Sequence, residues 1–143
     1  MIRVRRQRAE RRQMMTAEAE VLAELRRLRV QLPQLSGALA ASVDGLVLAQ
    51  DAMSEAEPLA ALTAAALGVA QRLTDTAGRG AFHELLLRGD EGYVATYAAG
   101  SSAVLTLLAQ PRINVGRLHL EARRASARIG DLVDGSLGRL ETP

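Results

Sequence analysis

The sequence predicts an α/β fold of the α+β type, with helices and strands in the order α-β-β-α-β-β-β-α. Three long segments repeat apolar residues every three to four positions, the spacing of an amphipathic helix. An Asp-Gly pair near residue 44 separates two short apolar runs, as in a β-hairpin. Between residues 82 and 109, three apolar runs are separated by glycine-containing turns, a pattern typical of consecutive strands.

The first helix is expected to begin at Thr16 and to end at Pro33. Thr16 can cap it, and Glu18 and Glu20 lie in its first turn, where the helix dipole favours acids. Proline cannot continue a helix, so Pro33 is expected to end it. The apolar stripe of this helix is Val21, Leu22, Leu25, Leu28 and Leu32.

The next segment predicts a hairpin. Residues 35–42 lack a helical stripe, and residues 46–49 are again apolar. Asp44 and Gly45 lie between the two runs, and this pair is favoured in tight turns whose central residues have positive φ.

The second helix is predicted to run from a cap at Ser54 to Leu73. Ser54 and Glu57 have the spacing of a capping box, and Pro58 is tolerated in a first turn. One stripe of this helix consists of Leu59, Leu62, Ala66, Val69 and Leu73.

A strip of very small residues adjoins that stripe: Ala61, Ala64, Ala65 and Gly68. Glycine costs about 1 kcal/mol relative to alanine inside a helix. The penalty at Gly68 is easier to understand if another backbone approaches there. That backbone could belong to the chain's own sheet or to a symmetry-related copy of the helix.

Three strands are then expected at residues 82–88, 93–98 and 103–109, joined by turns at residues 89–92 and 100–101. The first and last of these runs are apolar on both strand faces, so the sheet should be covered on both sides by helices or by a partner. A last helix is predicted from a cap at Asn114 to a stop at Gly135. Its apolar side carries Val115, Leu118, Ala122, Ala125, Ile129, Leu132 and Val133.

Charge is distributed unevenly along the chain. Six arginines against Glu10 give residues 1–12 a local charge of 6 − 1 = +5, whereas the rest carries 12 − 15 = −3. We therefore expect a basic, disordered arm at 1–15, one domain at 16–135 and a short tail at 136–143. The arm could bind nucleic acid, an anionic membrane or an acidic partner, or it could simply be solvated. Its arginines are Arg3, Arg5, Arg6, Arg8, Arg11 and Arg12.

Composition excludes several classes of function. The chain has 143 residues, 48% hydrophobic and 24% charged, which suits one globular domain. It lacks cysteine, so disulfides and thiolate sites are excluded, and it lacks lysine, so P-loop and Schiff-base chemistry are excluded. No apolar run approaches the roughly 20 residues that span a bilayer, and we predict a cytoplasmic protein.

No catalytic or cofactor site is predicted. His83 and His119 are the only histidines, and neither has a second ligand at metal-binding spacing. Asp44, Asp90 and Glu91 lie in predicted turns, where such residues satisfy backbone groups. We therefore expect no enzyme activity, no metal, no cofactor and no small-molecule substrate, although a small enzyme using one of the histidines is the weakest of the alternatives.

Four segments in this order resemble the roadblock/dynein light-chain family. They are the hairpin at residues 37–49, the helix start at residues 57–62, the Gly92-Tyr93 turn and the Asn114-Val115-Gly116 helix start. More narrowly, the chain resembles bacterial members encoded beside a small Ras-like GTPase in conservon operons. The resemblance spans residues 21–133.

The resemblance implies a roadblock-like domain with a central five-stranded antiparallel sheet between helices. It also implies a homodimer in which the second helix and the neighbouring third strand meet their copies. The interface residues would then be Ala61, Ala65, Gly68, Phe82, Glu84 and Leu86.

The functional expectation is a non-enzymatic homodimeric regulator or scaffold that binds a small Ras-like GTPase and modulates its nucleotide state or GTP hydrolysis. A sensor-kinase-like protein of the same operon is a further expected partner, and partners could recruit the protein to the membrane. The alternative is an adaptor that binds nucleic acid or an anionic surface through the arginine arm.

Overall fold

The computed structural model describes residues 2–141, with side chains through residue 138. The helices are α1 (Ile2–Gln31), α2 (Ala56–Thr76) and α3 (Val115–Glu141). The strands are β1 (Leu35–Ser42), β2 (Val47–Asp51), β3 (Glu84–Gly89), β4 (Gly92–Ala99) and β5 (Ala103–Ala109). They form one antiparallel sheet in the order β2-β1-β5-β4-β3. The predicted order of elements and the five-stranded sheet are confirmed.

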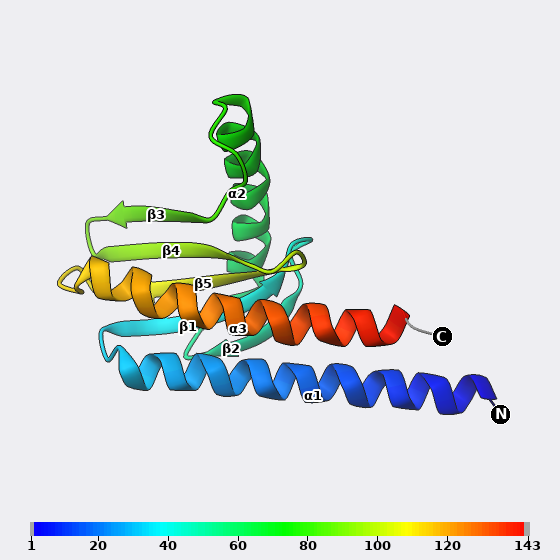
Figure 1. Cartoon of the computed structure of the whole chain (residues 1–143). Helices are drawn as coiled ribbons and strands as arrows, with labels where there is room; N and C mark the ends of the chain where they lie inside the picture. The colour runs from blue at the N-terminus through cyan, green and yellow to red at the C-terminus, as the bar shows by residue number, and fades with distance from the viewer. Residues whose placement is uncertain (1, 142–143) are drawn as a thin grey trace.

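The sheet lies between two helical layers (Figure 1). α1 and α3 lie side by side and antiparallel on one face, and α2 lies on the other. The larger core fills the space under α1 and α3 and includes Leu25, Leu28, Leu105, Leu118 and Ile129, none more than 1% exposed. Smaller clusters of apolar residues lie under α2.

α1 is longer than predicted. Residues 2–15, expected to be a disordered arm, form its first turns. The physical reason is that arginine, alanine, glutamine, glutamate and methionine favour helices, and neither glycine nor proline interrupts the segment. The cap predicted at Thr16 is wrong, because this residue lies within the helix and its Oγ1 donates to the Arg12 carbonyl oxygen at 2.8 Å.

The hairpin is confirmed, but its turn differs from the expected geometry. β1 has the predicted bounds, and β2 begins one residue later than expected and extends to Asp51. Gly45 has φ 94°, whereas Asp44 is not among the positive-φ residues. The Ser42 hydroxyl holds the turn, since it donates to the Asp44 carboxylate and accepts from the Leu46 amide at 3.0 Å.

α2 lacks the predicted capping box, because its N-cap is Glu55 and no side chain caps it. Its buried residues are Ala60, Thr63, Leu67 and Ala70. The stripe expected from the sequence lies next to this buried face rather than on it. The helix therefore approaches the sheet mostly through small side chains.

The meander and α3 follow the prediction except at their ends. β3 begins at Glu84 rather than at residue 82. A Cβ at Gly92, which has φ 144°, would overlap the Ala109 carbonyl oxygen, so this turn requires glycine. The Asn114 cap is confirmed, because its Oδ1 accepts from the Arg117 amide at 3.0 Å.

The predicted stop of α3 at Gly135 is wrong, since the helix continues to Glu141. Ser136 is 4% exposed, and Leu137 lies near Met14 of α1. Packing against the long α1 therefore accounts for the added turns. The tail expected at 136–143 is helical as far as residue 141, and residues 142–143 lie outside the described residues.

Candidate functional site

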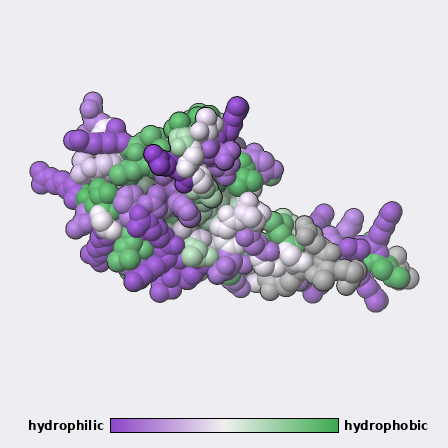
Figure 2. Space-filling view, turned by 45° about the horizontal axis from the view of Figure 1, so that its top comes forward, coloured by the Kyte–Doolittle hydropathy of each residue, from purple (hydrophilic) through white to green (hydrophobic). Residues whose placement is uncertain are grey.

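The outer face of α2 is apolar and uncovered. Leu62, Val69 and Leu73 are 66%, 68% and 67% exposed, although their size and chemistry are those of core residues. Ala65 and Gly68 lie between them on the same exposed side. In Figure 2, green hydrophobic patches reach the surface on the upper part of the body, where α2 lies. Contiguous patches of this kind mark interaction sites.

This face is continuous with an uncovered part of the sheet. α2 packs chiefly on β1, β2 and β5, which leaves the neighbouring β3 side less covered. Leu85 packs beside Leu67 and Phe82 below α2, and Leu87 is 50% exposed. β3 is an edge strand, so the backbone groups on its outer side have no strand partner within residues 2–141. Apolar side chains and a free sheet edge thus lie together.

The structure places the predicted interface residues in three positions. Ala61, Ala65 and Gly68 lie together on the exposed side of α2, and a Cβ at Gly68 would meet nothing within 4 Å. Phe82, by contrast, is only 8% exposed and packs beneath α2.

Glu84 and Leu86 point toward the opposite layer. Glu84 contacts α3, and Leu86 packs on the larger core. Because side chains alternate along a strand, Leu85 and Leu87 lie instead on the α2 side.

Sequence reasoning did not predict that Leu62, Val69 and Leu73 would be exposed. Their spacing places them on one stripe of a helix that has apolar residues on more than one side. A second stripe with equally good helical spacing could have indicated this exposure. It consists of residues 60, 63, 67 and 70, and it is the buried one.

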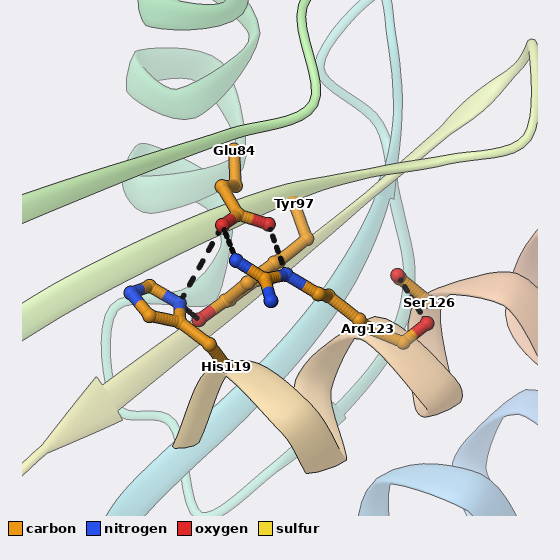
Figure 3. A network of polar contacts seen from close by, with 5 residues as sticks. All are labelled: Glu84, Tyr97, His119, Arg123 and Ser126. Carbon is orange, nitrogen blue, oxygen red and sulfur yellow. Dashed lines mark hydrogen bonds and ion pairs between the residues drawn. The ribbon is translucent and has the colours of Figure 1, made fainter. Parts of the chain in front are cut away.

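A polar network joins β3 to β4 and α3 on the far side of the sheet (Figure 3). Arg123 donates to both carboxylate oxygens of Glu84, with Nε 2.9 Å from Oε2. The Tyr97 hydroxyl lies 2.8 Å from His119 Nδ1, which is 3.9 Å from Glu84 Oε1. A hollow of about 690 Å³ adjoins the network and reaches Thr74 of α2.

The charged groups of the network stabilise one another. The hydrogen bonds from Arg123 lower the pKa of Glu84, and the same contact raises the pKa of Arg123. Burial raises the pKa of Tyr97, so it remains a neutral phenol. The side chains thereby fix the edge strand β3 against α3.

The six predicted arm arginines are all exposed on the projecting start of α1. Figure 2 shows purple side chains along this narrow extension. Arg6 pairs with Glu10 at 3.1 Å, and no other arginine of the arm forms an ion pair within the described residues. The arm and the α2 face are therefore two separate surfaces of the molecule.

Metal-binding clusters and membrane spans are both missing from the described part of the chain. Within residues 2–141, no group of three or more His, Asp or Glu side chains is placed to hold a metal ion. None of the helices in that range combines the length and apolar character needed to cross a membrane.

Comparison with known proteins identifies relatives in sequence and in fold. The Roadblock/LC7 domain family model matches residues 21–109. The uncharacterized protein MJ1340 of Methanocaldococcus jannaschii is 28% identical over 97 residues, which cover 66% of this chain and 84% of that protein.

Two solved structures of MglB superpose well on the chain. The gliding protein MglB of Thermus thermophilus has a TM-score of 0.76 at 22% identity, over 83% of this chain and 92% of its own. An MglB in a tetrameric arrangement has a TM-score of 0.77 at 21% identity, over 84% of this chain and 92% of its own. At these identities the likeness is one of fold.

Proposed function

Because the chain belongs to the Roadblock/LC7 family, we propose that it is a non-enzymatic homodimeric regulator or scaffold that binds a small Ras-like GTPase. The observation that carries the proposal is the exposed apolar face of α2 beside the free edge of β3. The resemblance to bacterial members encoded beside such a GTPase supports this class of partner. The tetrameric arrangement of an MglB relative supports a role in an assembly of several protomers.

In the proposed dimer, α2 packs against its copy. Ala61, Ala65 and Gly68 allow the two backbones to approach closely, and Leu62 and Val69 fill the flanks of the contact. Burying these large side chains stabilises the dimer by the hydrophobic effect, at roughly 25 cal/mol for each Å² removed from water.

The two β3 edges pair in the same contact, which covers the unpaired strand that would otherwise favour aggregation. Glu84 and Leu86 then contribute through their backbone groups, and Phe82 supports α2 from below. The polar network on Glu84 keeps β3 in position for this pairing.

Regulation follows from a difference in affinity. A scaffold that binds the GTP-bound and GDP-bound forms equally shifts neither, whereas preference for one form stabilises that nucleotide state. The proposal therefore requires binding that depends on the nucleotide. A sensor-kinase-like protein is a further proposed member of the complex, which would act in the cytoplasm and could reach the membrane through its partners.

The experiment is affinity capture from the native lysate with a non-hydrolysable GTP analogue or GDP in parallel, followed by mass spectrometry. We expect a small P-loop GTPase to be retained several-fold better in one nucleotide state. A bait that carries Val69→Arg tests whether capture of the GTPase requires the α2 face. Leu120→Arg is the matched control, because Leu120 is 48% exposed on α3. Equal recovery of the GTPase with both nucleotides would exclude the regulatory role.

A second candidate function rests on the exposed arginines at the start of α1. Such a basic helix can bind nucleic acid or an anionic surface through phosphate contacts. This function predicts that the affinity for a DNA duplex falls steeply, by about tenfold or more, between 50 and 200 mM salt. A protein lacking residues 2–12 should then show no binding, and a weak salt dependence would reject the candidate.

A further inference from the structure

A second surface lies away from α2, where α1 and α3 run beyond the sheet (Figure 1). There the two helices and the tip of the β1–β2 hairpin enclose a groove of about 480 Å³. Its floor is apolar and includes Met14, Val21, Leu48 and Val133. Leu46 at its margin is 66% exposed, so apolar surface is left open to solvent.

The charge of this groove has one sign. Among the lining residues whose side chains are described, Glu18 and Asp44 are the charged ones, and together they give the rim −2. The arm that precedes it, residues 2–12, carries +5 and interleaves its arginines with Ile2 and Val4, which are 85% and 50% exposed. The arm thus has both the charge and the apolar side chains that the groove would accept.

The arm cannot reach the groove of its own chain. α1 is one helix from Ile2 to Gln31, and Arg3 precedes Met14 by 11 residues, or about 16 Å along the axis. The arm therefore leads straight away from the groove, and folding back would break the helix. An occupant with this chemistry has to come from another molecule.

We propose that the groove binds residues 2–12 of a second copy of this chain. Two copies related by a two-fold axis each place their arm in the groove of the other, so the contact is self-complementary and closes. Val4, Arg8 and Arg12 lie on one face of the helical arm, because they are four residues apart. Arg8 and Arg12 of one arm face Glu18 and Asp44 of the other copy, and Val4 covers the apolar floor.

Nucleic acid is the competing occupant of the arm. It would neutralise the arginines, but it would leave Ile2, Val4 and the apolar groove exposed. A second copy pairs with the arginines and also covers Val4 and the apolar groove, and for this reason we favour it. The contact is separate from the α2 face, so it neither requires nor replaces the proposed dimer.

The test uses the full chain with Leu62→Arg and Val69→Arg, which remove association through α2. In this background, sedimentation equilibrium measures the remaining self-association. The arm variant carries Arg3→Glu, Arg5→Glu, Arg8→Glu and Arg12→Glu. Each reversal changes the charge by two, so the arm goes from +5 to 5 − 8 = −3.

The rim variant carries Glu18→Arg and Asp44→Arg, which change the rim from −2 to +2. A second rim variant, Glu18→Arg alone, leaves the Ser42–Asp44 turn intact. Tested singly, the arm variant and the double rim variant should each raise the dissociation constant at least about tenfold, because like charges then face one another. Glu18→Arg alone makes the rim neutral and should raise the dissociation constant less.

An equimolar mixture of the two variants should restore association to within about threefold of the background, because each arm again meets a rim of opposite charge. The control reverses four other exposed arginines, Arg26, Arg72, Arg79 and Arg112, and should leave association unchanged. Helical circular dichroism checks that every variant is folded.

Loss of association in both variants with recovery in the mixture supports the proposal. It is overturned if the background does not associate at 100 µM, if either variant associates like the background, or if the mixture fails to recover. If the background does not associate but binds a DNA duplex, and the arm variant loses that binding, the arm is assigned to the competing function. Because the background already lacks the α2 contact, these outcomes do not depend on whether the proposed α2 dimer exists.

Discussion

At the scale of single residues, Glu84 is the position whose ionisation is coupled to the fold. It accepts two hydrogen bonds from Arg123 and is 3.9 Å from His119 Nδ1, so its carboxylate ties the edge strand to α3. These contacts lower its pKa from the ordinary value of 4.5. Because Arg123 is largely exposed, solvent screening keeps the contribution modest.

The sign of the pH dependence follows from this shift. A carboxyl whose pKa is lower in the folded than in the unfolded state stabilises the fold above the ordinary pKa, and the contribution is lost as pH falls through the folded value. Glu84→Gln should therefore lower the Tm by roughly 2 to 4 °C at pH 7. The difference in Tm between Glu84→Gln and the wild type should shrink below pH 4.5 and vanish at the lowest pH, where both side chains are neutral.

Thermal unfolding across this pH range measures the effect. Glu91→Gln removes one carboxylate from the exposed β3–β4 turn and controls for the change in net charge. If the difference in Tm between Glu84→Gln and the wild type stays constant down to pH 2, the lost contact is not ionic.

At the scale of elements, local chemistry predicted most of the fold. The bounds of β1 and β5 and the cap at Asn114 follow from short-range preferences for strands and for a side chain that accepts an amide. The sheet order does not follow from them, because β1 pairs with β5 across more than 60 residues. Only the resemblance to a known family supplied the expectation of one five-stranded sheet.

The errors at α3 and α2 share a physical cause, which is that helix ends and helix faces depend on packing. α3 runs past its predicted end along α1, whereas the added turns of α1 are exposed and follow from residues that favour helices. In α2, two stripes compete for the core, and the sheet accepts the one with smaller residues. Sequence spacing alone cannot rank two stripes when one is apolar and the other is apolar except for Thr63.

The candidate site, like the fold, could be predicted only in part from the sequence. The small residues Ala61, Ala65 and Gly68 identified the exposed side of α2 because a helix glycine is costly unless space is needed. The strand residues Glu84 and Leu86 followed from the resemblance, which implies pairing of two strand edges, and they stay a prediction. That their side chains lie on the α3 side, with Leu85 and Leu87 on the α2 side, follows from alternation along the strand. The groove between α1 and α3 could not be predicted, because its lining includes Met14, Ser136 and Leu137, which lie beyond the predicted ends of the two helices.

At the scale of the whole molecule, the two proposed contacts differ in chemistry and should therefore respond oppositely to salt. The α2 contact buries apolar side chains, which salting-out ions such as sulfate strengthen. The arm contact pairs exposed charges, which salt screens over a Debye length of about 10 Å at 0.1 M. The wild type should thus associate in two steps that can be separated by ionic strength alone.

Sedimentation velocity at 50 mM and 500 mM sodium sulfate tests this expectation. At high salt we predict a species of twice the 15.3 kDa chain, and at low salt and high concentration a larger species in which arms link these dimers. Leu62→Arg with Val69→Arg should abolish the high-salt dimer and leave only salt-sensitive association, whereas Leu120→Arg should keep both. A high-salt monomer in the wild type would contradict the α2 dimer, because an apolar contact cannot be screened away.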